Sequence, residues 1–296
     1  MPNERVILCG DAAPGNTLYP DPNPIRLAWT VDGNVRVRIE DIRKPMWRDV
    51  PNQFQDLIDI ATYVYCADQA VTRGGDGVDN LGEDWRRRLF FHIPVRDPAL
   101  WSDAKMREEL ASTLSFLSED EYHFEFVNLK ERRSFQTYFN FANDQPLGGK
   151  IEEVMLFSGG LDSVAGVVQE VITDKKQIVL VNHRSSDKLV TRQRELLSKL
   201  RAHAGHVPIE FIPVHINKDK GLGREYTQRS RSFLYAALAA TIAQMLDLNR
   251  IRFYENGVVS LNLPLAAQVV GARATRTTHP QVLNGFERLF SARGLV

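Results

Sequence analysis

Cysteine is scarce in this sequence: only Cys9 and Cys66 occur among 296 residues. Two cysteines cannot build a disulfide framework or a four-cysteine zinc site, so no zinc site is expected. The seven histidines are scattered, and the one close pair, His203 and His206, lies in a polar His-Ala-Gly-His turn without a nearby cysteine. A solvated loop explains that pair better than a metal site does.

A surplus of either charge is also missing, since 37 Lys and Arg residues balance 37 Asp and Glu residues. A neutral chain has no global field to attract nucleic acid or an anionic membrane, so neither is expected as a direct ligand. No apolar run is long enough to span a bilayer; the nearest, 233–246, contains Thr241 and Gln244 and suits a buried helix. The first residues also lack the pattern of a signal peptide. These absences predict a cytoplasmic protein.

The length of the chain predicts two domains. In the first half, residues 25–31 and 35–39 alternate apolar and polar side chains around Asp32-Gly33-Asn34, which predicts a β-hairpin. The further predicted elements are a helix over 54–65 ended by the glycine-rich sequence 74–77, a strand at 89–95, a helix begun by Asp97-Pro98 and a strand at 122–127. We therefore expect residues 1–148 to form a mixed α+β domain that docks partners or substrate.

Turn-forming residues at 143–150 mark the predicted domain boundary. Beyond them, short apolar runs without polar alternation are separated by helical segments. Strands of this kind are buried on both faces and run parallel, so 151–296 is predicted to be a three-layer α/β domain. Its strands are expected at 154–157, 178–182, 209–214 and 251–254, and its helices at 164–172, 189–200 and 233–246.

One motif carries chemistry: Ser158-Gly-Gly-Leu-Asp-Ser163, between the first of these strands and a helix. Two adjacent glycines let successive amides turn into one concavity. That concavity lies at a helix N-terminus, where unpaired amides and the helix dipole favour an anion, and both serine hydroxyls can donate. The alternative is a tight strand-to-helix turn with incidental serines. The pattern favours a polyphosphate-binding loop.

This motif resembles the SGGxDS signature of the PP-loop ATP pyrophosphatases and lacks the Gly-Lys-Ser/Thr of Walker A. The resemblance implies a Rossmann-like fold in which the loop grips the pyrophosphate of ATP and a substrate oxygen attacks the α-phosphate. An adenylate then forms, pyrophosphate leaves, and an amine, ammonia or sulfur later displaces AMP. By the same resemblance Mg²⁺ lies near Asp162, and Ser158, Asp162 and Ser163 act by charge stabilisation and positioning. The residues assigned to ATP are Phe157, Ser158, Gly159, Gly160, Leu161, Asp162 and Ser163.

A later segment, Arg229-Ser-Arg-Ser-Phe-Leu, is similar to the helix of 7-cyano-7-deazaguanine synthase (QueC) that begins Arg-Asn-x-x-Phe-Leu. Arg229 matches, whereas Ser230 replaces the asparagine. The resemblance assigns Arg229 to catalysis and both Arg229 and Arg231 to the phosphates, with solvated surface charges as the alternative. His183, just past the second predicted strand, is expected to border the adenine, with a structural histidine as the alternative.

Two departures from QueC point to one of its relatives. This chain has no zinc-binding cysteine cluster, and it carries an additional N-terminal region. In this arrangement, and in its segments 255–264 and 276–280, the chain looks more like the QueC-like proteins of bacterial anti-phage systems, the QatC type. The segment from Glu255 follows the fourth strand, at the sheet edge where open α/β folds bind ligands. Residues expected to contact substrate are Glu255, Asn256, Thr277, Thr278 and His279, with a structural role as the alternative for His279.

The leading hypothesis is an ATP-dependent ligase or synthetase that forms a C–N bond through an adenylate. The resemblance implies a deazaguanine-like carboxylate or a modified partner protein as substrate, together with other proteins of a defence operon. Pro2 excludes an N-terminal cysteine nucleophile, so nitrogen is expected from solution or a partner. Both cysteines lie in the N-terminal half, which disfavours the tRNA-thiolating branch.

The alternative is a catalytically silent subunit that binds ATP or acts as a scaffold in a defence complex. Two features motivate it: the zinc tail is missing, and no fifth apolar run follows residue 254, although the superfamily sheet usually has another strand. The PP-loop domain is therefore expected to be incomplete at its C-terminus.

Overall fold

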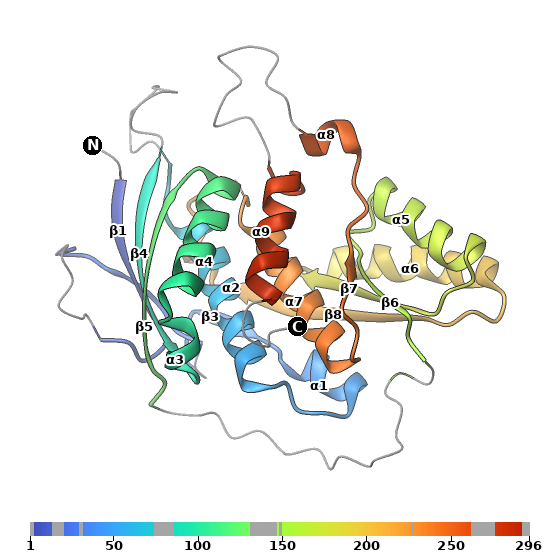
Figure 1. The fold of residues 1–296 in the computed structure, drawn as a ribbon, viewed down its shortest axis with the longest axis horizontal. Coiled ribbons are helices and arrows are strands. Elements are labelled where there is room, and N and C mark those ends of the chain that lie inside the picture. Colours follow the sequence, from blue (N-terminus) through green and yellow to red (C-terminus); the bar gives the residue numbers. More distant parts are fainter. Residues whose placement is uncertain are drawn as a thin grey trace.

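The computed structural model describes residues 3–13, 21–29, 32–73, 86–130, 147, 150–225, 228–261 and 276–291. These residues form two β-sheets with helices between them and outside the second sheet (Figure 1). The class is α/β, as predicted for the second half of the chain. Among the helices in these ranges, none combines the length and apolarity that crossing a bilayer requires.

The first sheet has the strand order β2-β1-β4-β5 and every pair in it is parallel. Its strands are β1 (Asn3–Cys9), β2 (Ile25–Leu27), β4 (Arg87–Val95) and β5 (Glu121–Asn128). The helices α2 (Asn52–Ala70), α3 (Pro98–Trp101) and α4 (Ala104–Ser118) make the crossovers that parallel strands need. The predicted mixed α+β domain was therefore wrong, since this half is also α/β.

The two strands of the predicted hairpin lie in different sheets. β3 (Val35–Val37) pairs antiparallel with β8 (Ile209–Lys218) of the second sheet, whereas β2 pairs with β1. Alternation and a turn signal do not specify the partner of a strand, and here tertiary pairing decided it. After β3, the carboxylate of Asp41 in α1 (Glu40–Met46) accepts the backbone N–H of His215 at 2.9 Å. Residues before 148 thus contribute a strand and a helix to the second sheet.

The second sheet has the order β3-β8-β7-β6-β9, and β8, β7, β6 and β9 run parallel as predicted. Its further strands are β6 (Glu153–Leu156), β7 (Ile178–Arg184) and β9 (Ile251–Arg252). One face packs against α5 (Leu161–Val167), the π-helical turn Val168–Thr173 that continues it, and α6 (Asp187–Ala204). The other face packs against α7 (Arg231–Met245), beside α9 (Pro280–Ser291). A 3-10 turn, Lys220–Leu222, and α8 (Gly257–Leu261) complete the described elements.

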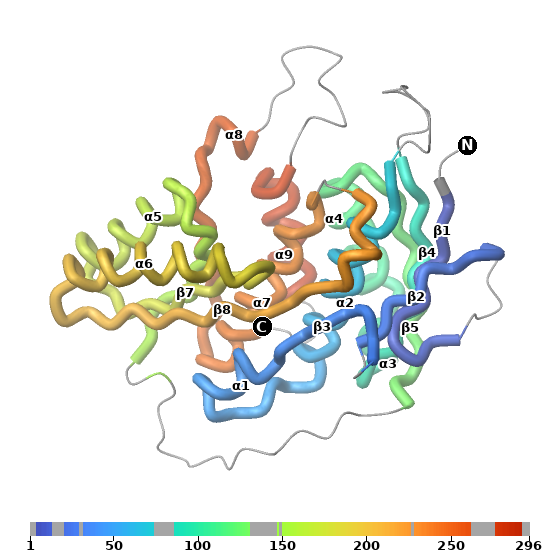
Figure 2. Tube along the Cα trace, turned by 180° about the vertical axis from the view of Figure 1, so that it is seen from behind, coloured from blue at the N-terminus to red at the C-terminus, as the bar shows by residue number. Residues whose placement is uncertain are grey.

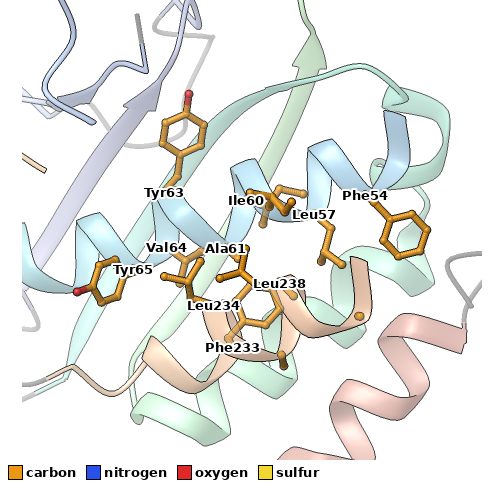
Figure 3. Close-up of a cluster of buried hydrophobic side chains, with 14 of the residues drawn as sticks. Phe54, Leu57, Ile60, Ala61, Tyr63, Val64, Tyr65, Phe233, Leu234 and Leu238 are labelled. Carbon is orange, nitrogen blue, oxygen red and sulfur yellow. The ribbon is translucent and has the colours of Figure 1, made fainter. Parts of the chain in front are cut away.

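Helices α2 and α7 form the centre of the molecule and join its two halves. Figure 3 shows Ala61 and Val64 of α2 against Leu234 and Leu238 of α7, all of them buried. Because α2 is enclosed by the first sheet and by α7, even its polar residues from Asp56 to Gln69 are buried. Figure 2 shows the same central helices from behind, between the two sheets. One apolar core therefore extends from the first sheet to the second.

A cluster of buried charges accompanies this core. The Arg87 guanidinium donates to Asp68 Oδ1 at 2.6 Å and to Asp120 Oδ2 and Oδ1 at 2.6 and 3.1 Å. Its Nη1 donates to the carbonyl oxygens of Asp68 and Val71, so all five guanidinium donors are used. Asp68 Oδ2 also accepts from the backbone N–H and the hydroxyl of Ser230, at 3.1 and 3.0 Å. The cluster thus links α2, β4 and β5 to the start of α7.

Replacing Arg87 by methionine should strongly destabilise the fold, because Asp68 and Asp120 would keep only Arg73 as a buried counter-charge. We expect Arg87→Met to lower the free energy of unfolding by about 3–5 kcal/mol, measured by urea denaturation. The control is Arg88→Met: Arg88 is 28% exposed and pairs with Glu4 and Glu121 on the opposite face of the sheet. Such a pair is worth about 0–1 kcal/mol, so equal losses in the two variants would contradict this account.

Candidate functional site

The second sheet has a point where its strand order reverses. The parallel strands lie in the order β8-β7-β6-β9. After β6, the chain adds β7 and then β8 on one side of β6, and it places β9 on the opposite side of β6. The connections that leave the carboxyl ends of β6 and β9 therefore diverge. Such a switch point creates the crevice in which open α/β sheets bind ligands. The loop 157–160 and the segment 253–256 leave the sheet here.

The glycine-rich loop is fixed from beneath. Phe157 is buried; its N–H donates to Val181 O at 2.9 Å, and its carbonyl oxygen accepts from Asn182 Nδ2 at 2.6 Å. Gln193 Nε2 donates to Ser158 O at 2.8 Å. Gly159 has φ +81°, and a Cβ there would lie 3.0 Å from Cγ of Gln193. The turn therefore requires glycine at this position.

The two serine hydroxyls lie inside the turn. Ser163 Oγ accepts from Gly159 N–H at 3.2 Å and donates to Gly160 O at 2.9 Å, while Ser158 Oγ accepts from Gly160 N–H at 3.2 Å. The two oxygens are 3.3 Å apart. The first intrahelical bond of α5 runs from Val164 N–H to Gly160 O, and Gly160 has no side chain with which to cap the helix. The backbone amides of 161–163 are thus those that a helix N-terminus offers to an anion.

Beside this loop lies a cavity of about 100 Å³, which we call the loop cavity. Its polar lining comes from four places in the sequence: the loop, the start of α7, the segment after β9 and the segment before α9. The residues concerned are Ser158, Ser163, Ser232, Tyr235, Tyr254, Glu255, Thr277 and Thr278. The structure thus brings the predicted residues Ser158, Ser163, Glu255, Thr277 and Thr278 together around one cavity.

Sequence reasoning missed five lining residues of the loop cavity, one of which is Leu156 at the end of β6. Ser232 and Tyr235 project from the first turns of α7, and Phe253 and Tyr254 follow β9. Ser232 and Tyr235 are three residues apart, so both lie on one face of the helix. This spacing could have been read from the sequence that follows Arg229. The buried hydroxyl of Ser232 has no hydrogen-bond partner in the described part of the protein.

The charge of Asp162 acts on Glu255, although Asp162 is not among the described lining residues of the loop cavity. Partial burial raises the pKa of the Glu255 carboxyl, and the negative charge of Asp162 raises it further. Two carboxylates that repel each other in this way are suited to sharing a divalent cation. The described residues contain no group of three or more acidic, histidine or cysteine side chains around a metal position. A cation here would need further oxygen ligands from a bound molecule.

The two predicted arginines do not line the loop cavity. Arg229 is buried, with Nη1 3.5 Å from Ser118 O and 3.9 Å from Glu119 Oε2, so it belongs to the charged region around Asp68. Burial and the nearby charge of Arg73 lower the pKa of Arg229. Arg231 Nη2 donates to the phenol oxygen of Tyr235 at 3.4 Å. Arg231 therefore reaches the cavity through Tyr235.

The remaining predicted residues have structural contacts. The Asn256 carboxamide oxygen accepts from Val258 N–H and Val259 N–H, at 3.0 and 3.2 Å, and so caps α8. His279 Nδ1 accepts from Gln281 N–H at 3.1 Å at the start of α9, and its ring centroid lies 5.0 Å from that of Phe116. Leu161 is 83% exposed. None of these three residues lines the loop cavity.

His183 is a core histidine. It is 2% exposed, and its Nε2 hydrogen bonds Ile216 O at 2.8 Å. Its ring lies 5.0 Å from the Tyr65 ring and 6.0 Å from the Tyr235 ring. Burial, helped by the charge of Arg231, lowers the pKa of His183 to about 4. The imidazole is therefore neutral near pH 7 and donates its Nε2 proton to the carbonyl.

This burial gives His183 a pH signature. The unfolded chain gains a proton on this residue below pH 6.5, whereas the folded chain gains it only near pH 4. Stability is thus complete above pH 6.5 and falls between pH 6.5 and 4, by up to about 3 kcal/mol. In urea denaturation across this range, His183→Gln should show a correspondingly shallower loss, because glutamine can keep the hydrogen bond but does not titrate. The exposed control His203→Gln should retain the wild-type profile, and identical profiles for all three proteins would contradict the assignment.

Comparison with known proteins does not place this chain in a family. No protein-family model, no curated protein and no solved structure matches it. A function for this chain therefore has to be argued from its own residues and their geometry.

Proposed function

We propose that this chain is a PP-loop ATP-binding enzyme of the QueC-like type, which adenylates a carboxylate substrate with release of pyrophosphate. One observation carries the proposal: the Ser158–Ser163 loop meets Glu255, Thr277 and Thr278 around one cavity at the switch point of a parallel sheet. Helix-start amides and hydroxyls on one side suit phosphate groups. The carboxylate and hydroxyls on the other side suit a substrate and a cation.

The chain's own groups supply positioning and charge in this proposal. In the structure the hydroxyls of Ser158 and Ser163 accept hydrogen bonds from the N–H groups of Gly160 and Gly159. When ATP binds, these hydroxyls would donate to phosphate oxygens, and the two N–H groups would become free to do the same. Mg²⁺ would be held between Asp162 and Glu255, with ATP phosphates as its other ligands. ATP supplies the activated phosphorus, and the residues orient it for attack by the substrate oxygen.

The substrate side is larger and more apolar than the phosphate side. A hollow of about 540 Å³ shares Phe253, Glu255 and Thr278 with the loop cavity and is otherwise lined mainly by apolar residues, among them Val258 and Leu261. A flat heteroaromatic acid such as a deazaguanine-like carboxylate fits such walls, with its polar edge toward Glu255. We also propose that the enzyme is cytoplasmic and acts with other proteins of an anti-phage operon. Its substrate would be that acid or a partner protein.

Removing the loop's polar groups should weaken ATP binding. We expect Ser158→Ala/Asp162→Ala to reduce the affinity for MgATP about tenfold or more, since a hydrogen bond to a charged group is worth about 1.5–3 kcal/mol. Calorimetric titration with MgATP measures the affinity, and pyrophosphate release with a panel of deazapurine carboxylates measures turnover. The matched control is Ser112→Ala/Glu195→Ala, which removes the same kinds of group from exposed helix positions. Unchanged affinity in the loop variant would refute the proposed ATP site.

A second candidate function is a silent ATP-binding subunit of a defence complex. Arg229, the arginine expected at the phosphates, lies in the buried charged region, which favours this alternative. Pyrophosphate release, measured alongside the MgATP titrations, distinguishes the two functions. Tight MgATP binding without pyrophosphate release across the substrate panel and operon partners would support the silent subunit, whereas any cleavage at the α-phosphate would exclude it.

Glu255 provides an independent test of the cation. Its raised pKa means that the charged carboxylate is disfavoured in the folded protein, so its contribution to stability declines as pH rises past its ordinary titration range. Without ligand, Glu255→Gln should therefore melt at the wild-type temperature or above it at pH 7. With MgATP, the variant should gain less thermal stabilisation than the wild type because a metal ligand is lost. The exposed control Glu287→Gln should behave as wild type in both measurements, and a full MgATP response in Glu255→Gln would remove this residue from the metal site.

A further inference from the structure

A second cavity, of about 450 Å³, lies at the first sheet, and none of its described lining residues also lines the loop cavity. We call it the basic cavity, because Arg5 of β1, Arg26 of β2 and Arg224, which follows the 3-10 turn, all line it. Asn23 and Thr72 add polar groups. Its apolar lining is Pro24, Ile25, Ala70, Val71 and Leu222.

The charges of the basic cavity are unbalanced. No acidic residue is among its described lining residues, and within the described part of the chain none of its three guanidinium groups has an ion-pair partner. Three acids lie close to these arginines in the sequence, and among the described residues none of them pairs with a guanidinium group of the cavity; one of them, Glu4, pairs with Arg88. Asp21 accepts the N–H groups of Val6 and Asn23 at 3.0 and 2.8 Å, and Glu225 accepts the N–H of Arg73 at 3.0 Å. Three uncompensated cations around one hollow attract an anion.

The backbone that carries these arginines is fixed. Arg5 lies in β1, where it pairs with Leu89 of β4. The N–H of Arg224 donates to Gln69 O at 2.9 Å and to Leu222 O at 3.1 Å, which ties its segment to the end of α2. These contacts hold the Cα positions of Arg5 and Arg224 around the same hollow.

We propose that the basic cavity binds a phosphorylated small molecule of about the size of a sugar phosphate or mononucleotide. Guanidinium groups match the oxygens of a phosphate ester by paired hydrogen bonds. The cavity volume falls in the range of small-molecule sites and exceeds the space that a single phosphate fills. The apolar walls around Ile25 and Leu222 give the rest of the molecule a surface to contact. This inference does not depend on the proposed activity at the loop cavity.

The test uses the whole chain carrying Ser158→Ala/Asp162→Ala, so that the loop cavity does not contribute to the signal. Calorimetric titrations with inorganic phosphate, ribose 5-phosphate, AMP and succinate separate the ligand classes. We expect a phosphate ester to bind more tightly than inorganic phosphate, and succinate to bind weakest. Absence of binding by every phosphate-bearing probe at millimolar concentration, or succinate binding as tightly as the esters, would overturn the proposal.

Two variants locate the binding at the arginines. Arg5→Gln/Arg224→Gln should weaken the ester about tenfold or more, corresponding to about 1.4 kcal/mol. Arg5→Lys/Arg224→Lys retains the charge without the planar fork and should give an intermediate loss, which also guards against misfolding of the first variant. The control Arg107→Gln/Arg194→Gln removes two exposed helix arginines and should leave binding unchanged. Equal affinities in the glutamine variant and this control would place the ligand elsewhere.

Discussion

The ion cluster of Arg87, Asp68 and Asp120 is the interaction on which the relation between the two sheets depends. Charges buried this deeply are tolerated only when every hydrogen-bonding position is filled, and all five donors of Arg87 are used. Because Asp68 also accepts from Ser230, the same carboxylate fixes the start of α7. The next residues of α7 include Ser232, which lines the loop cavity. The buried carboxylate of Asp68, beside the first sheet, thereby helps to position Ser232 at the candidate site of the second sheet.

The site itself follows from the order of the strands. With β7 on one side of β6 and β9 on the other, the loop after β6 and the segment after β9 face each other at the same edge. The helix start supplies amides, and Asp162 and Glu255 supply carboxylates; burial, together with repulsion by Asp162, raises the pKa of Glu255. Amide donors that suit the phosphates of a nucleotide thus lie near carboxylates that suit its cation. This complementarity is the physical basis of the proposed adenylating activity.

Local signals predicted the parts of the structure that depend on nearest neighbours. The runs at 154–157 and 178–182 became parallel strands because continuous apolar sequence is stable only when covered on both faces. The hairpin and the α+β class were wrong because they concern which strands pair, and alternation does not encode that. In the site, Ser158, Ser163 and Glu255 were predicted from motif and position. Arg229 was placed by its resemblance to QueC, and Asn256 by the same sheet-edge argument as Glu255. The Asn256 and His279 side chains instead bind backbone N–H groups at helix starts, and Arg229 contacts Ser118 O, 111 residues away in the chain.

The sequence by itself determined the glycine-rich turn, since the positive φ of Gly159 and the hydroxyls of its serines are properties of neighbouring residues. It also determined the buried character of α7 and the parallel strands around β6. Only the tertiary structure decided that β3 joins the second sheet, that His183 is enclosed between Tyr65 and Tyr235, and that Arg5 and Arg224 line one cavity. The reason is physical: these outcomes depend on contacts between residues far apart in the chain, whose energies exist only after the core has brought them together.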